Sequence, residues 1–293
     1  MNSPITRLID YGESTFDALE AFWENPRTQR FSANLLIVTF ILTLIIIELR
    51  RRGFLPDALK SVFPDSHFFA VSIAFTMLLG IEILGLVFSV ARSVSESLGK
   101  QFEILSLILL RQSFKEFIYF DEPIEWQKVS EPVMHILSDT GGALAIFAML
   151  AFYNRIQLHR PVVMDANERL KFIAAKKLVG LLLLLIFISV GLNDLARSFA
   201  GLPTYDFFAT FYTILVFSDV LLVLVSLRYS PNYLILFRNS GFAVATVIIR
   251  LALTAPAYIN VLLGVAAAFF AVGVTIAYNV SSSFKARTSK EDL

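Results

Sequence analysis

The sequence predicts an all-α membrane protein, a polytopic bundle of transmembrane helices. Of its 293 residues, 56% are hydrophobic and only 17% are charged, and the mean hydropathy is +0.69. A water-soluble domain of this length cannot bury so much apolar surface. Several apolar runs also reach the roughly 20 residues that a helix needs to cross about 30 Å of hydrocarbon. The lipid bilayer is therefore the expected solvent for most of the chain.

Apolar runs predict about seven crossings within a transmembrane domain at residues 31–280. A polar tail, residues 281–293, follows the last crossing. Small residues in the third and seventh crossings favour close helix packing, within one subunit or in a homo-oligomer. The seven crossings are expected at residues 31–49, 68–91, 135–153, 178–195, 207–228, 241–254 and 257–278.

Residues 1–30 precede the first crossing and combine apolar residues with acids at roughly helical spacing. This pattern suits a short amphipathic helix at the membrane interface, and a partly ordered polar terminus is the alternative. The acids and the lack of an early apolar core predict that this segment is not a secretory signal peptide.

Residues 92–132 interrupt the pattern of crossings. Their only continuous apolar run is too short to span a bilayer and is bracketed by charged residues. We expect an amphipathic extramembrane insertion, with residues 93–120 forming a helix on the membrane surface. The alternative, a charged helix buried inside the bundle as in a voltage sensor, would require the bundle to accommodate Lys100, Glu103, Arg111, Lys115 and Glu116.

Basic residues predict the orientation of the chain. Arg50, Arg51 and Arg52 follow the first crossing, and a basic loop covers residues 154–177. Cytoplasmic loops are enriched in Lys and Arg, so seven crossings place the N-terminus outside and the C-terminus in the cytoplasm of a cell-membrane protein. If residues 92–132 also crossed the membrane, there would be eight spans and the three arginines would lie outside.

Asp219 lies in the middle of the fifth crossing and shares one helical stripe with Tyr212 and Ser226. A carboxylate at this depth costs about 3 kcal/mol on insertion scales, so it needs a partner, a proton or water. One interpretation is an acid that carries a proton or an ion. The other is a structural hydrogen bond between helices.

Two further charges are expected at similar depth. Glu82 lies near the centre of the second crossing, where it is either a second functional acid or a protonated group bonded to a neighbouring backbone. Arg250 shares a stripe with Asn239, Thr246 and Thr254. It is either the counter-charge of Asp219 or Glu82, or it snorkels outward.

Polar residues at helix ends suggest an outer vestibule lined by His135, Asp139, Asn193 and Asp194. His135 and Asp139 lie four residues apart and could ligate a metal or couple a proton, but their place at the beginning of a crossing favours ordinary interfacial positions. Without cysteine or an H-E-x-x-H motif, the sequence predicts no metal site. We expect no other cofactor either.

The sequence contains no nucleotide-binding glycine pattern and no serine-nucleophile motif, which argues against an enzyme. A net charge of +1 gives no electrostatic reason for binding nucleic acid. We therefore expect a channel or transporter that passes a small ion, a proton or a coupled solute. The alternative is a membrane sensor, scaffold or subunit of a larger membrane complex, and an intramembrane enzyme using His135 and Asp139 is a third hypothesis.

Overall fold

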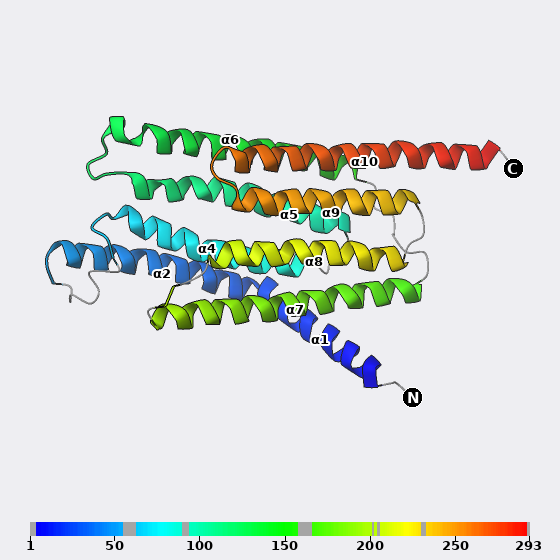
Figure 1. Ribbon diagram of the computed structural model, residues 1–293, viewed down its shortest axis with the longest axis horizontal. Coiled ribbons are helices and arrows are strands. Elements are labelled where there is room, and N and C mark those ends of the chain that lie inside the picture. Colours follow the sequence, from blue (N-terminus) through cyan, green and yellow to red (C-terminus); the bar gives the residue numbers. More distant parts are fainter. Residues whose placement is uncertain are drawn as a thin grey trace.

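The computed structural model describes residues 4–54, 63–89, 94–157, 166–200, 202–203, 206–229 and 233–291, and it contains only helices and connecting segments there. The main helices lie side by side as one elongated bundle (Figure 1). They are α1 (Pro4–Glu24), α2 (Pro26–Arg51), α4 (Phe68–Ser89), α5 (Val94–Lys115), the 3-10 helix η1 (Glu116–Tyr119), α6 (Trp126–Ile156), α7 (Ala166–Phe199), α8 (Phe207–Tyr229), α9 (Tyr233–Thr254) and α10 (Ile259–Glu291).

Seven of these helices, α2, α4 and α6 to α10, are long and apolar enough to cross a membrane. This confirms the polytopic helical fold predicted from the apolar runs. The sixth span is longer than expected, because α9 begins at Tyr233 and includes Arg238. The guanidinium of Arg238 is buried, with its central carbon 4.5 Å from the centre of the Tyr278 ring. A cation–π contact therefore lets the helix continue through a basic residue that looked like a boundary.

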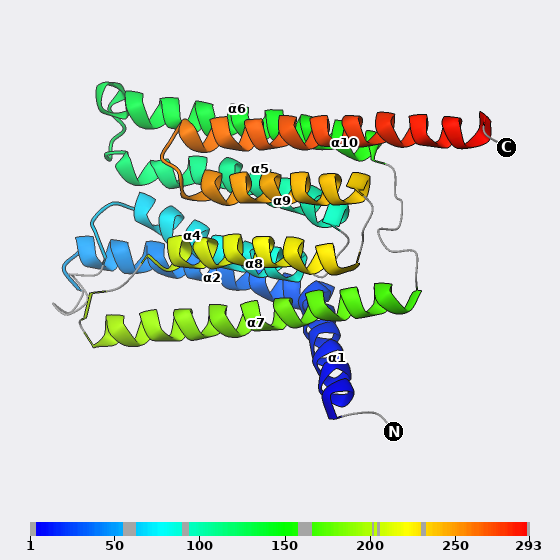
Figure 2. The same cartoon turned by 45° about the vertical axis from the view of Figure 1, so that its right-hand side comes forward.

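Helix α5 differs from the sequence prediction, because it does not lie on the outside of the bundle. It packs along α4, α6 and α9, and Figures 1 and 2 show it running with the other helices. Gly99 lies against Tyr153 of α6, and Ser113 bonds Thr140 at the other end of the same interface. These contacts make α5 and α6 antiparallel neighbours over most of their shared length.

Two features of α5 explain its burial. Leu98, Phe102, Leu105 and Leu109 form one fully buried apolar stripe at helical spacing. Two charged residues of this segment find partners on other helices: Arg111 pairs with Glu82 of α4, and Glu116 of η1 pairs with His135 of α6. Lys100 and Glu103 pair with each other at the surface of the bundle. The bundle thus accommodates Arg111 and Glu116, which a lipid-facing helix could not do at low cost.

Because α5 runs the length of the bundle, chain direction alternates over eight consecutive helices, α2 and α4 to α10 (Figure 1). We call the two ends of the bundle the Arg51 end, where α2 stops, and the Lys177 end, where α6 stops and α7 begins. The basic run 50–52 thus lies opposite the basic segment of α7. The N-terminal and C-terminal helices both extend at the Lys177 end, where α1 lies across the bundle (Figure 2).

Acids neutralise the three arginines at the Arg51 end. Arg50 Nε lies 3.0 Å from Asp65 Oδ1, and Arg52 Nε lies 2.7 Å from Glu48 Oε1. Arg51 Nη2 lies 2.6 Å from Glu122 Oε2. Burial raises the pKa of Glu122, but hydrogen bonds from His67 and Arg51 outweigh burial and leave this pKa below its ordinary value. The run 50–52 is therefore part of a charge network rather than a free basic patch.

The glycine pair in α6 provides a test of the packing. An added Cβ at Gly142 would overlap the side chain of Val261 on α10, whereas one at Gly141 meets nothing within 4 Å. We expect Gly142→Ala to lower the free energy of unfolding by about 1–3 kcal/mol through overpacking. Gly141→Ala should have no destabilising effect, since alanine has the higher helix propensity. Thermal unfolding of both variants in one detergent measures this, and equal losses would contradict the interface.

Candidate functional site: a buried ion pair between two cavities

Asp219 of α8 and Arg250 of α9 form an ion pair inside the bundle. Arg250 Nε lies 3.4 Å from Asp219 Oδ2, and the two side chains are 0% and 6% exposed. The sequence left open whether Arg250 pairs with an acid inside the bundle or extends outward, and in the structure it points inward and pairs with Asp219. The pair depends on the packing of α8 against α9, which brings the middle of one helix to the second half of the other.

This ion pair leaves hydrogen-bonding groups unused. All three guanidinium nitrogens of Arg250 and Oδ2 of Asp219 are buried without a hydrogen-bond partner in the described part of the chain. The separation of 3.4 Å is also longer than the 2.7–2.9 Å that is typical of a charge-assisted hydrogen bond. Buried donors and acceptors cost about 1–3 kcal/mol each when they are left unpaired. The site therefore favours an additional occupant, such as water or a polar solute.

Glu82 has a different counter-charge, Arg111 of α5. Arg250 was the only counter-charge that we predicted for Glu82, because the segment that contains Arg111 was expected on the membrane surface. A helical signal was present, since the buried apolar stripe of α5 extends beyond its short continuous apolar run. The two intramembrane acids thus belong to two separate ion pairs.

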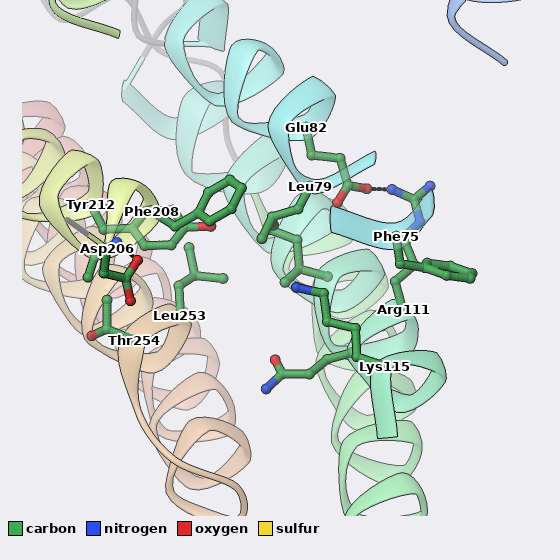
Figure 3. A pocket seen from close by; sticks show the side chains of 13 residues that line it. Phe75, Leu79, Glu82, Arg111, Lys115, Asp206, Phe208, Tyr212, Leu253 and Thr254 are labelled. Atoms are coloured by element: carbon green, nitrogen blue, oxygen red, sulfur yellow. Dashed lines mark hydrogen bonds and ion pairs between the residues drawn. The ribbon is translucent and has the colours of Figure 1, made fainter. Parts of the chain in front are cut away.

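A cavity of about 240 Å³ lies between α4, α5, α8 and α9 in the half of the bundle nearer the Arg51 end (Figure 3). Leu79, Phe75 and Phe208 are among its apolar walls. Its polar groups come from all four helices and from the residue that precedes α8. They are Glu82, Arg111, Gln112, Lys115, Asp206, Tyr212 and Thr254.

A second, smaller cavity of about 50 Å³ lies toward the Lys177 end, between α5, α7, α8 and α9. Three buried oxygens among its lining residues lack a hydrogen-bond partner within the described ranges: Gln101 Oε1, Asn239 Oδ1 and Asp219 Oδ2. Lys176 supplies a buried positive charge. A cavity of this size has room for one or two water molecules, which occupy about 30 Å³ each in the liquid.

The two cavities lie along the same three helices. Ile108 of α5, Tyr212 of α8 and Leu253 of α9 line the larger cavity, and Gln101, Asp219 and Thr246 of the same helices line the smaller one. On each helix about 10 Å of rise separates the two lining residues. That interval contains Leu105 on α5, Leu215 on α8 and Arg250 on α9, all buried. Arg250 and an apolar layer thus separate the two cavities.

Tyr212 lines the larger cavity, and its buried hydroxyl has no hydrogen-bond partner among the described residues. The side chain of Ser226, the third member of the predicted stripe, lies outside the described residues. Asn239 and Thr246 of the α9 stripe line the smaller cavity, and Thr254 lines the larger. The sequence stripes therefore identified residues of both cavities but missed the contribution of α5.

The predicted vestibule does not form. His135 and Asp139 belong to α6, whereas Asn193 and Asp194 belong to α7 on the opposite side of the bundle (Figures 1 and 2). The two helices share no interface among the described residues. The four residues shared only a position near the outer ends of crossings, and most helices end in polar residues whatever their neighbours.

His135 and Asp139 also have separate partners. His135 Nδ1 lies 3.2 Å from Glu116 Oε2, and the buried Asp139 accepts a hydrogen bond of 2.9 Å from Asn260 Nδ2 of α10. The described residues include no group of three or more His, Cys, Asp or Glu side chains suited to a metal ion. The bond between Asp139 and Asn260 joins α6 to α10 close to the Gly142 contact.

Comparisons with protein-family models, curated proteins and solved structures give no match for this chain. Its functional interpretation therefore rests on the geometry of the bundle and its two cavities.

The contribution of the Asp219–Arg250 pair to stability can be measured with single and double substitutions. Arg250→Met leaves a buried carboxylate without its counter-charge, so we expect a loss of about 3–5 kcal/mol in the free energy of unfolding. Arg250→Met combined with Asp219→Leu removes both charges and should recover most of that loss. Equilibrium unfolding in detergent gives both values. Additive losses in the double variant would contradict a direct interaction.

Proposed function

We propose that this integral membrane protein passes a small ion, a proton or a coupled polar solute along α5, α8 and α9. The observation that supports the proposal is the pair of polar cavities on either side of the Asp219–Arg250 pair. Charged side chains are costly within a bilayer and tend to mark ion or substrate pathways. A structural bundle of this size would be more stable with apolar residues in these positions.

The ion pair is suited to act as a gate. Asp219 carries the charge that holds Arg250 in place, so protonation of its carboxyl group would release the guanidinium. A protonated Asp219 and a freed Arg250 would allow the two cavities to exchange water or solute through the layer that separates them. The ion pair would then have two states, formed and broken, and the uptake of a proton would favour the broken state in which the route is open.

The alternative role as a sensor, scaffold or complex subunit has less support. Its sequence argument relied on an amphipathic surface helix at residues 93–120, on the basic loop 154–177 and on faces of small residues. Helix α5 is instead packed among α4, α6 and α9. The basic loop contains residues 158–165, which lie outside the described residues. The small-residue faces suit packing within one subunit as well as between subunits. Helix α1 exposes Tyr11 and Phe22 and suits a position at the membrane interface.

We further propose that both termini are cytoplasmic. The segments that meet at the Lys177 end contain more Lys and Arg than those at the Arg51 end, and cytoplasmic segments are enriched in these residues. The arginines 50–52, which had favoured a cytoplasmic Arg51 end, are paired with acids. This orientation keeps the cytoplasmic C-terminus expected from the sequence and moves the N-terminus to the same side.

Flux measurements test the transport proposal. Proteoliposomes that contain the wild-type protein should pass at least one species from a panel of H⁺, Na⁺, K⁺ and Cl⁻ faster than empty vesicles. Asp219→Asn is neutral, like the protonated carboxyl group that releases Arg250, so we expect it to raise that flux at least tenfold and to remove the dependence of the flux on pH. Glu131→Gln, at an exposed acid of α6, is the matched control and should retain wild-type flux. If wild type and Asp219→Asn both behave like empty vesicles across a panel of ions and small solutes, the transport proposal is wrong.

Cysteine labelling tests the orientation, and the absence of native cysteine provides a clean background. Phe54 at the Arg51 end and Tyr11 of α1 are each 75% exposed. We expect a membrane-impermeant maleimide to label Phe54→Cys in intact cells and Tyr11→Cys only after permeabilisation. The seven-crossing arrangement, with α5 on the surface, gives the reverse pattern at both positions.

A further inference from the structure

The larger cavity presents two opposite charges that face one another across it. Lys115 is the last residue of α5, and Asp206 immediately precedes α8. Figure 3 shows the Lys115 side chain reaching from the α5 wall toward the wall that carries Asp206. Lys115 and Asp206 both line the cavity, and no ion pair within 4.0 Å joins these two side chains in the described part of the chain.

The other two charges of the cavity neutralise each other. Glu82 and Arg111 are in direct contact on the wall formed by α4 and α5. The cavity therefore offers a ligand one positive group and one negative group, separated by open space and located on opposite walls. A purely anionic ligand would meet the repulsion of Asp206, and a purely cationic ligand would meet that of Lys115.

Two side chains on the α8 wall are arranged to receive a ligand. Asp206 Oδ1 accepts the backbone N–H of Ala209 at 3.0 Å, as in an N-cap, and this bond fixes the carboxylate at the start of α8. Tyr212, which is 3% exposed, adds a buried hydroxyl without a hydrogen-bond partner in the described part of the chain. Such a group is satisfied when a ligand or water occupies the cavity.

We propose that the larger cavity binds a small zwitterion, with its cationic group on Asp206 and its anionic group on Lys115. The volume of about 240 Å³ has room for about eight water molecules or a solute of similar size. The inference deepens the proposed function by naming a solute class. Binding itself does not require transport, so the two can be tested separately.

Ligand-induced stabilisation of the purified protein measures binding. The probes are the zwitterions glycine and 4-aminobutyrate, which differ in charge separation, and the single charges acetate and methylammonium at the same ionic strength. A ligand that binds only the folded state raises the unfolding midpoint in a saturable manner. We expect at least one zwitterion to do so, and neither single charge to do so at the same concentration.

Substitutions assign the two ends of the ligand. Lys115→Gln and Asp206→Asn should each weaken zwitterion binding at least tenfold, and asparagine preserves the cap of α8. Lys128→Gln and Asp121→Asn provide a matched control, because these residues form an exposed pair at the same end of the bundle, 3.2 Å apart. The control variants should bind as the wild type does.

Each result leads to one conclusion. The zwitterion proposal is overturned if no probe binds, if acetate binds with dependence on Lys115 alone, or if methylammonium binds with dependence on Asp206 alone. Binding of a zwitterion without flux of that zwitterion would overturn the proposal that it is transported and would support the proposed binding site. Flux of an inorganic ion without zwitterion binding would support the transport function and overturn the zwitterion site.

A zwitterionic lipid headgroup has the same chemistry as a soluble zwitterion, and a separate arm distinguishes the two sources. Delipidated protein is tested with soluble glycerophosphoethanolamine, a phosphodiester zwitterion, and, in parallel, with phosphatidylethanolamine in mixed micelles. Stabilisation by both, lost in Lys115→Gln and Asp206→Asn, supports a headgroup-sized zwitterion from either source. Stabilisation by the lipid alone, with the same dependence, assigns the site to a lipid headgroup.

Discussion

The arrangement of this bundle depends on the neutralisation of charges that its helices bring into an apolar environment. A charge at the centre of a bilayer is tolerated when an opposite charge or a hydrogen-bond network accompanies it. Arg111 of α5 meets Glu82, and Arg250 of α9 meets Asp219. The Arg111–Glu82 pair lowers the cost of burying α5, and α5 lines both cavities.

The burial of α5 also explains the division of the core. One apolar cluster joins α5 with α6, α9 and α10, and the other joins α5 with α1, α4, α7 and α8. Helix α5 takes part in both, and both cavities lie along it. The two cavities therefore lie where the two halves of the bundle meet, and ligand sites between helices are common in helical bundles.

Much of the fold was accessible from the sequence, because a run of about 20 apolar residues has few interpretations other than a membrane span. The burial of α5 was not accessible from the sequence, because charged residues such as Arg111 interrupt its apolar stripe and have their partners on other helices. In the orientation that we propose, its burial reverses the expected direction of the first two crossings. Helical spacing predicted that Tyr212 and Asp219 face the interior, where both are buried, because spacing within one helix is local information. The same spacing left open whether Arg250 points inward or outward. The predicted grouping of His135 and Asp139 with Asn193 and Asp194 was wrong, because the sequence of one helix does not specify which helices pack beside it.

The charge network at the Arg51 end has a consequence for the synthesis of the protein. Arg50, Arg51 and Arg52 are made before Asp65 and Glu122, which neutralise two of them in the folded bundle. In the orientation that we propose, the first span thus enters the membrane with an uncompensated signal for the opposite direction. Its final direction then depends on segments translated later, and assembly of the N-terminal helices is completed only when α5 and Glu122 have been made.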